Sequence, residues 1–61
     1  MPVVEVKMWA GRTSEQKEKI IKDITKAFEE IGVPKEHTTV IIQEIPKENW
    51  GTKGEQASKV K

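Results

Sequence analysis

Hydrophobic and polar side chains alternate near the start of the chain, from Val3 to Met8. Three apolar residues share one face of the predicted element: Val4, Val6 and Met8. The opposite face carries a more mixed set, which Trp9 extends: Val3, Glu5 and Lys7. A period of two residues is the pattern of a β-strand with one covered face. We therefore predict a strand over residues 3–8, continued by Trp9.

A helix is predicted directly after this strand. Residues 11–14 break the alternation, and Thr13 and Gln16 have the spacing of a capping box at a helix start. Apolar residues then recur at helical spacing: Ile20, Ile21, Ile24, Ala27, Phe28 and Ile31. Lysines and glutamates occupy the other side, which indicates a solvated outer face. Gly32 fits the position after a helix, and Pro34 prevents the helix from continuing.

The second strand is predicted over Thr38–Ile45, where β-branched residues dominate. Two strands joined by a crossover helix are expected to be parallel with a right-handed connection, so residues 3–45 form one β-α-β unit. The polar remainder, residues 46–61, carries Gly51 and Gly54 and predicts a turn or a hairpin. The predicted fold class is therefore α+β, with two parallel strands in each subunit.

The composition leaves this unit short of internal stabilisation. The chain has 61 residues, 34% of them hydrophobic, and no cysteine, so we expect a single domain over residues 1–61 without disulfides. A chain of this length buries only about 60% of its unfolded surface. One helix covers only one face of the sheet, yet apolar residues are expected on the other: Val3, Trp9, Ile41 and Ile45. We therefore predict a homo-oligomer in which another copy covers that face.

The charges are nearly balanced, at a formal net charge of +1. This balance gives no strong attraction to nucleic acid or to an anionic membrane, so neither is expected as a partner. No apolar stretch approaches membrane-spanning length, and the first residues lack a secretory pattern. A cytoplasmic protein is the expectation.

Pro2 is the first residue with a candidate chemical role. Small residues at this position generally allow removal of Met1, which leaves a secondary amine at the start of the chain. An α-amino group titrates slightly above neutrality in model peptides, and burial or a nearby cation lowers its pKa. A buried amino-terminal proline would therefore be a free base at neutral pH. The alternative is a proline that merely begins a strand, where its missing N–H costs nothing, and the residue alone favours this alternative.

Arg12 is the second candidate, and it is the only arginine of the chain. It stands between the predicted strand and the helix start, where its guanidinium and the helix dipole both favour an anion such as a carboxylate. A solvated loop arginine is an equally good interpretation of the position. In a chain with so many lysines, however, a single arginine at this turn favours a role that needs the two parallel hydrogen bonds a guanidinium can donate.

The remaining candidates carry weaker signals. Trp50 lies in the polar tail and fits either a subunit interface, which we favour, or the wall of a small pocket. His37 has no second histidine or cysteine with which to form a metal site, so we interpret it as a surface residue. Residues 51–54 match the GxxG loop of KH-type RNA-binding proteins, but they do not join two helices, and the balanced charge opposes RNA binding.

The order of these motifs is similar to that of a known family. Pro2 opens a short strand, Gly11-Arg12-Thr13 leads into EQKEKII, the second strand contains VIIQEI, and Trp50-Gly51 precedes the final GEQASKVK. Over nearly the whole chain this order resembles the 4-oxalocrotonate tautomerase family. The resemblance implies a β-α-β subunit with a C-terminal hairpin, assembled as a hexamer of three dimers. It also implies a tautomerase that needs no cofactor and acts on a small carboxylate.

Roles for individual residues follow from the resemblance. Pro2, once freed of Met1, corresponds to the general base that moves a proton along a 2-hydroxy-dienoate or a related 2-oxo acid. Arg12 corresponds to the arginine that binds a substrate carboxylate and stabilises the dienolate. Trp50 occupies an aromatic position that keeps the pocket apolar, and a backbone amide near Trp9 is expected to contact a substrate oxygen. We therefore expect an isomerase with Pro2 and Arg12 as catalytic residues.

Thr39 departs from the pattern of the family. Its best-known members have a second arginine at this position, contributed by a neighbouring subunit. Threonine cannot neutralise a carboxylate, and losing a charge-assisted contact typically costs about 1.5 to 3 kcal/mol. We therefore predict a preference for substrates with one carboxylate over the dicarboxylate 2-hydroxymuconate. The alternative function is a non-catalytic homo-oligomeric binding or scaffold module of the same fold, with nucleic-acid binding third.

Overall fold

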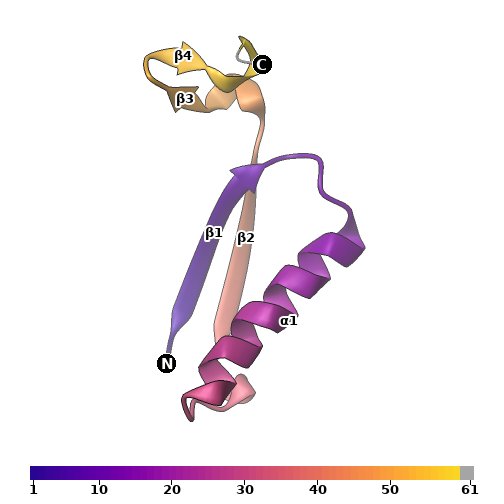
Figure 1. Ribbon diagram of the computed structural model, residues 1–61, viewed down its shortest axis with the longest axis vertical. Coiled ribbons are helices and arrows are strands. Elements are labelled where there is room, and N and C mark those ends of the chain that lie inside the picture. The colour runs from indigo at the N-terminus through magenta and orange to yellow at the C-terminus, as the bar shows by residue number, and fades with distance from the viewer. Residues whose placement is uncertain (60–61) are drawn as a thin grey trace.

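The computed structural model describes residues 1–59 and contains a β-α-β unit followed by a small hairpin (Figure 1). The elements of the unit are β1 (Val3–Trp9), α1 (Ser14–Glu30) and β2 (Thr39–Ile45). The hairpin pairs β3 (Gly51–Thr52) with β4 (Glu55–Gln56). Short 3₁₀ turns cover Lys35–His37, Lys47–Asn49 and Ala57–Lys59. The predicted α+β class and the order of elements are confirmed. Val60 and Lys61, which end the motif GEQASKVK, lie outside the described residues.

β1 and β2 pair in parallel along their full length, from Val3 beside Thr39 to Trp9 beside Ile45. Paired residues of a parallel sheet point to the same side, so this register defines both faces. One face carries Val4, Val6 and Met8 from β1 with Val40, Ile42 and Glu44 from β2. The other face carries Val3, Glu5, Lys7 and Trp9 with Thr39, Ile41, Gln43 and Ile45. The predicted alternation of β1 is therefore correct.

α1 begins at the predicted capping box, and the predicted glycine, Gly32, lies just after its end. The Thr13 hydroxyl accepts from the Gln16 N–H at 3.1 Å, and the Gln16 side chain accepts from the Thr13 N–H at 3.0 Å. Gly32 adopts a φ of +94°, a conformation that side-chain-bearing residues rarely adopt, and its N–H donates to the Glu29 carbonyl. Together these contacts satisfy backbone groups at both helix ends.

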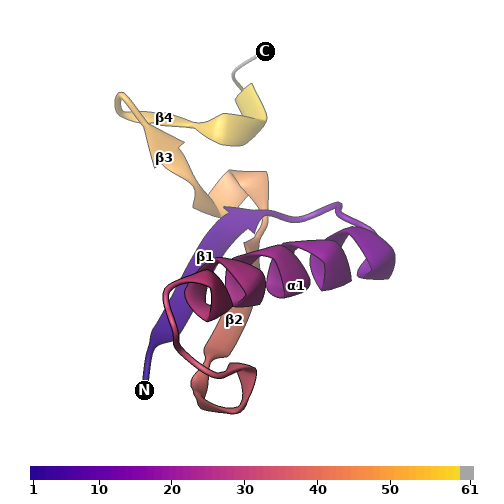
Figure 2. The same cartoon turned by 60° about the horizontal axis from the view of Figure 1, so that its bottom comes forward.

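α1 lies against only one face of the sheet, as Figure 2 shows. The apolar helix residues that become half-buried are spaced about one turn apart: Ile20, Ile24 and Phe28. The predicted apolar stripe is wider than this contact, because Ile21 stays 39% exposed and Ile31 stays 74% exposed. Within residues 1–59, no helix is long and apolar enough to cross a membrane.

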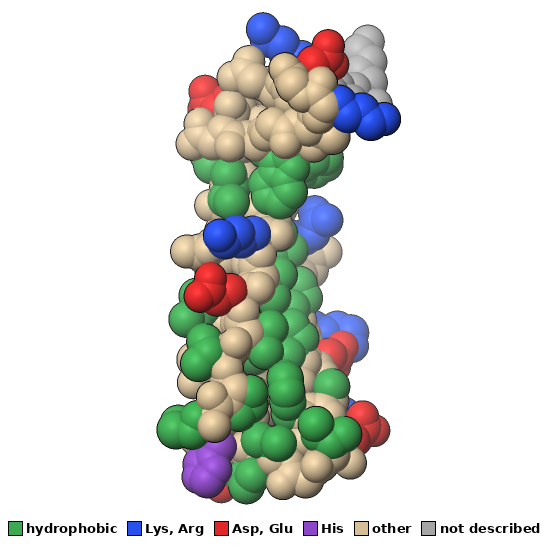
Figure 3. Space-filling view, turned by 90° about the vertical axis from the view of Figure 1, so that its left-hand side faces the viewer, with side chains coloured by type: hydrophobic (Ala, Val, Ile, Leu, Met, Phe, Trp, Pro, Cys, Tyr) green, Lys and Arg blue, Asp and Glu red, His purple; other side chains and the backbone are tan. Residues whose placement is uncertain are grey.

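The face of the sheet opposite α1 is open. Val3 is 59% exposed, Ile41 43% and Trp9 42%, and hydrophobic side chains run along this side between charged ones (Figure 3). Among the described residues only Ala57 is buried. The radius of gyration is 14.5 Å, against about 10 Å for a compact domain of this length. A single chain therefore does not enclose a core of its own.

The hairpin extends past the carboxyl ends of β1 and β2, at the end of the molecule opposite the amino terminus (Figure 1). Its turn residues, Lys53 and Gly54, both have positive φ, the geometry of a tight hairpin turn. The chain then folds back, since the Ala57 N–H donates to the Trp50 carbonyl at 2.7 Å and the Gln56 side chain donates to the Glu48 carbonyl at 2.9 Å. These bonds tie the hairpin to the segment that carries Trp50.

Candidate functional site

Two of the predicted site residues, Pro2 and Thr39, lie together at the amino end of the sheet. The Thr39 N–H donates to the Pro2 carbonyl at 3.0 Å, which continues the parallel ladder by one step. Pro2 is half-buried there, whereas Met1 is 89% exposed. While Met1 is attached, the Pro2 nitrogen is an amide without basicity. Removal of Met1 would leave a secondary amine at the open end of the sheet.

The other three predicted residues, Arg12, Trp9 and Trp50, lie at the carboxyl end. The rings of Trp9 and Trp50 meet edge to face, with centroids 6.1 Å apart and planes at 80°. This arrangement is favourable for aromatic pairs and gives that end of the sheet a rigid apolar surface. The Ala10 N–H donates to the Ile45 carbonyl at 3.1 Å, so the loop that carries Arg12 starts beside the end of β2.

Pro2 and Arg12 of one chain are therefore far apart. They flank β1, and a strand of this length spans about 20 Å at roughly 3.3 Å per residue. Figure 1 shows the amino terminus at one end of the sheet and the loop between β1 and α1 at the other. Within residues 1–59 of a single chain no pocket is present. One molecule of small substrate cannot contact both residues of the same chain.

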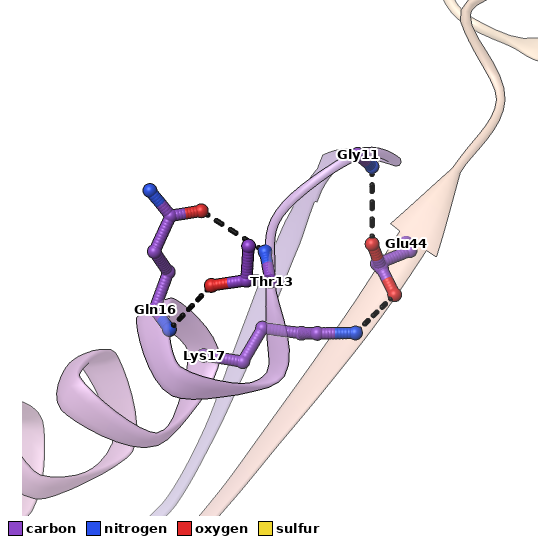
Figure 4. A network of polar contacts seen from close by, with 5 residues as sticks. All are labelled: Gly11, Thr13, Gln16, Lys17 and Glu44. Atoms are coloured by element: carbon purple, nitrogen blue, oxygen red, sulfur yellow. Dashed lines mark hydrogen bonds and ion pairs between the residues drawn. The ribbon is translucent and has the colours of Figure 1, made fainter.

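The loop that carries Arg12 is held by a polar network (Figure 4). One carboxylate oxygen of Glu44 accepts from the Lys17 ammonium at 2.6 Å, and the other accepts from the Gly11 N–H at 3.3 Å. Gly11 has a φ of +124°, which favours glycine at this sharp exit from the strand. The Arg12 side chain is exposed, and among the described residues its guanidinium has no hydrogen-bond or ion-pair partner. Its guanidinium is thus free to meet an anion.

Glu44 was not identified as a site residue from the sequence, although a signal was present. The alternation of β2 places it on the same face as the apolar residues Val40 and Ile42, where a charge needs a partner. The hydrogen bond from Lys17 is the main reason that the pKa of the Glu44 carboxyl is lowered, and the Gly11 N–H lowers that pKa further. Glu44 therefore joins β2, α1 and the Arg12 loop.

Replacing Glu44 by glutamine is expected to remove part of the acid sensitivity of the fold. A carboxyl whose pKa is lowered by folding stabilises the folded state at pH values above its unfolded-state pKa. This contribution is lost as the pH falls through its pKa in the folded state. As the pH falls below 4.5, the ordinary pKa of a glutamate carboxyl, the free energy of unfolding of the wild type should therefore decrease more steeply than that of Glu44→Gln. Denaturant unfolding at a series of pH values and one protein concentration measures the difference.

The matched control for this experiment is Glu29→Gln, which removes a carboxylate from the exposed side of α1. Its unfolding curve should depend on pH as the wild-type curve does. Parallel pH dependence of the wild type and Glu44→Gln would show that the network does not stabilise the loop.

The weaker sequence candidates take no part in a cluster. His37 is exposed on its 3₁₀ turn, and among residues 1–59 no group of three or more histidine, aspartate or glutamate side chains is placed to hold a metal ion. Residues 51–54 form the hairpin turn and not a loop between two helices. The correspondence to an RNA-binding GxxG loop therefore fails on structure.

Comparisons with known proteins agree with this fold. A family model described as "Tautomerase enzyme" matches residues 2–59. A 2-hydroxymuconate tautomerase from Comamonas testosteroni is 39% identical over 61 residues, covering 98% of this chain and 97% of that protein.

Solved structures give the same result. The crystal structure of YwhB, a homologue of 4-oxalocrotonate tautomerase, superposes with a TM-score of 0.91 at 36% identity, covering 98% of this chain and all of that one. A heterohexameric 4-oxalocrotonate tautomerase from Chloroflexus aurantiacus superposes with a TM-score of 0.90 at 27% identity, covering both chains fully. The sequence match and the shared β-α-β-hairpin structure show that this chain belongs to the 4-oxalocrotonate tautomerase family and is an isomerase.

Proposed function

We propose that this tautomerase uses the Pro2 amine as a general base to shift a proton in a small 2-hydroxy-dienoate or a related 2-oxo acid. The observation that carries the proposal is the location of Pro2. It directly follows an exposed Met1 and is half-buried at the free end of β1. Loss of Met1 would therefore create a basic nitrogen at a point where a substrate can approach it.

The proton shift needs one base of suitable strength. The Pro2 nitrogen takes the proton from the enol hydroxyl, electrons move along the conjugated system, and the same nitrogen returns the proton to a carbon. For this the amine must be uncharged near neutral pH. An apolar wall such as Trp50 and a cation such as Arg12 both lower the pKa of an amine, because both disfavour its ammonium form.

Arg12 is proposed to bind the substrate carboxylate. A guanidinium can donate two parallel hydrogen bonds to a carboxylate, which fixes the orientation of the substrate. It also attracts the negative charge that develops in the dienolate, so its effect is larger in the transition state than in the ground state. Trp50 provides an apolar wall beside it, and the backbone amide near Trp9 is proposed to donate to a substrate oxygen.

The separation of Pro2 and Arg12 leads us to propose that each site is shared between two copies of the chain. β1 forms one edge of the two-stranded sheet. Antiparallel pairing of two β1 edges centred on Val6 would place Pro2 of one copy beside Ala10 of the other, next to Arg12. In this register Glu5 lies opposite Lys7, which makes the edge complementary to itself in charge.

The open face of the sheet indicates that the assembly goes beyond a dimer. Three dimers that cover one another's open faces would bury the exposed side chains of Val3, Ile41 and Trp9. We therefore propose a homohexamer built as a trimer of dimers. Sedimentation at micromolar concentration measures the mass directly, and a folded monomer under these conditions would contradict the shared site.

Thr39 is proposed to set the number of carboxylates that the substrate carries. Its position beside Pro2 places a neutral side chain at that end of the site. A dicarboxylate would bring a second negative charge there without a cation to meet it, which carries a desolvation cost. Substrates with one carboxylate, such as a 2-hydroxy-dienoate monoacid or the enol of phenylpyruvate, avoid this cost.

Thr39→Arg is expected to raise kcat/KM for 2-hydroxymuconate by about tenfold or more, since a charge-assisted hydrogen bond contributes about 1.5 to 3 kcal/mol. The change for a monocarboxylate enol should be much smaller. Initial rates with both substrates, followed by absorbance, measure the two ratios. Equal efficiency of the wild type and Thr39→Arg on 2-hydroxymuconate would contradict this role of Thr39.

The proposed function is tested by a spectrophotometric assay with a panel of mono- and dicarboxylate enols. The protein must have an intact mass that proves the loss of Met1, because the amide form cannot act as a base. We expect turnover of at least one monocarboxylate enol. The absence of any turnover by assembled protein that begins at Pro2 would favour a non-catalytic module with the same fold.

A further inference from the structure

We propose that Lys47 is a second carboxylate-binding group of this site and acts together with Arg12 at the carboxyl end of the sheet. This inference rests on the proposed function, because it concerns the substrate carboxylate. Lys47 begins the 3₁₀ turn Lys47–Asn49 that follows β2. Its neighbours in space are the two tryptophans already described.

The Lys47 ammonium contacts the ring of Trp9, and the backbone of Lys47 is bonded to that of Trp50. The Nζ atom lies 4.7 Å from the centroid of the Trp9 ring, within the range of a cation–π interaction. The backbone N–H of Trp50 donates to the Lys47 carbonyl at 3.1 Å, and the two indole rings contact each other. An ammonium has three donors, and the ring face takes up one side of it. The remaining N–H groups are left to bind an anion.

The charge of Lys47 is also uncompensated. Three other lysines form ion pairs within their own chain: Lys17, Lys19 and Lys22. Among residues 1–59, no carboxylate lies within ion-pair distance of Lys47. Aromatic rings on one side of an ammonium also displace water, which strengthens its attraction for an anion. Lys47 is therefore equipped as an anion-binding group.

Lys47 and Arg12 follow two strand ends that lie side by side. Arg12 lies two residues after Ala10, and Lys47 lies two residues after Ile45, while the Ala10 N–H donates to the Ile45 carbonyl at 3.1 Å. The chain segments that carry the two cations thus leave the same end of the sheet, whereas Thr39 at the other end is neutral. A substrate suited to this distribution has one carboxylate at the cationic end and an apolar unsaturated chain along the tryptophans. This substrate class is an unsaturated monocarboxylate.

The test compares binding of sorbate with binding of 2,4-hexadien-1-ol by titration calorimetry. Both ligands have the same dienyl chain, but only sorbate carries a carboxylate, and neither has an enol that can turn over. We expect Lys47→Met to raise the Kd for sorbate about threefold to tenfold, as for a partly exposed charge pair. Lys47→Arg should stay within about twofold of the wild type, because it keeps the charge. Binding of the alcohol should not change.

The chain contains a matched control for Lys47. Lys35 also follows a proline and begins a 3₁₀ turn, but at the amino end of β2 and without an aromatic partner among the described residues. Lys35→Met should bind sorbate as the wild type does. Sedimentation of every variant confirms that the assembly is unchanged, and Lys47→Gln replaces Lys47→Met if the latter does not assemble.

Three results would overturn the role of Lys47. One is a wild type that does not bind sorbate, and another is unchanged sorbate binding in Lys47→Met. The third is an equal weakening of sorbate binding and alcohol binding in Lys47→Met, which would show that Lys47 only packs against Trp9. Failure of the proposed function is distinguishable, because it would appear as absent enol turnover while sorbate binding still depends on Lys47.

Discussion

Pro2→Ala is expected to lower kcat/KM for enol turnover by about 10² to 10⁴-fold, the usual contribution of a positioned general base. Alanine leaves a primary amine at the chain start, so a base remains. It lacks the ring that fixes the direction of the nitrogen lone pair, and a primary amine is more strongly hydrated. The reaction therefore loses both the fixed lone-pair geometry and the base strength of the secondary amine. Initial rates with a monocarboxylate enol measure the effect.

A second form of the same protein sharpens this prediction. When Met1 or another residue is kept before Pro2, the Pro2 nitrogen is an amide, and turnover should fall at least as far as in Pro2→Ala. Sedimentation and the unfolding curve serve as controls, since Pro2 bonds only through its carbonyl to the Thr39 N–H in the described structure. Full activity of a protein whose mass includes Met1 would refute Pro2 as the base.

Arg12→Ala is expected to lower kcat/KM for carboxylate substrates by about 10 to 10²-fold, since a charge-assisted hydrogen bond contributes about 1.5 to 3 kcal/mol. Because the Arg12 guanidinium is exposed and has no partner among the described residues, its removal should leave the free energy of unfolding nearly unchanged. Lys26→Ala, on the exposed side of α1, is the control for loss of a positive charge. Equal activity of Arg12→Ala and the wild type would exclude the carboxylate role.

Mixing the two impaired variants tests whether the site is shared. Arg12→Ala supplies an intact Pro2, and Pro2→Ala supplies an intact Arg12, so a hybrid pair contains one complete site. Random reassembly after unfolding should restore about a quarter of the wild-type activity, because half of the pairs are hybrids and each has one good site of two. Activity no greater than the average of the two variants would place Pro2 and Arg12 of the same chain in one site.

The local structure of this chain could be predicted because it depends on neighbouring residues. The capping box of Thr13 and Gln16 and the turn at Gly32 involve residues close in sequence, and the structure confirms both. The alternation in β1 likewise identifies its two faces. Parallel pairing followed from the presence of a single crossover helix.

Contacts between distant residues could not be predicted in the same way. The bonds from Glu44 to Lys17 and Gly11 join residues 27 and 33 positions apart. The cation–π contact of Lys47 with Trp9 depends on how the 3₁₀ turn leaves β2. A charged residue on the apolar face of β2 was a readable signal for Glu44. No pattern along the chain indicated the partner of Lys47.

Pro2 and Arg12 lie far apart in one chain, and the sequence alone did not indicate this separation. Sequence motifs name Pro2 and Arg12 but give no distance between them, and only the straight seven-residue β1 places them at opposite ends. Because α1 covers only one face of the sheet, this small chain also leaves apolar surface exposed on the other face. Assembly would cover that surface and complete the site at once.

The state of the Pro2 nitrogen is the central claim, and titration of that nitrogen by NMR tests it directly. The protein is labelled with ¹⁵N-proline, shown by mass to begin at Pro2, and followed across neutral pH. We predict a single transition with a pKa below the ordinary value of an amino terminus, coinciding with the acid limb of kcat/KM. A nitrogen that remains cationic well into the alkaline range would contradict catalysis by Pro2.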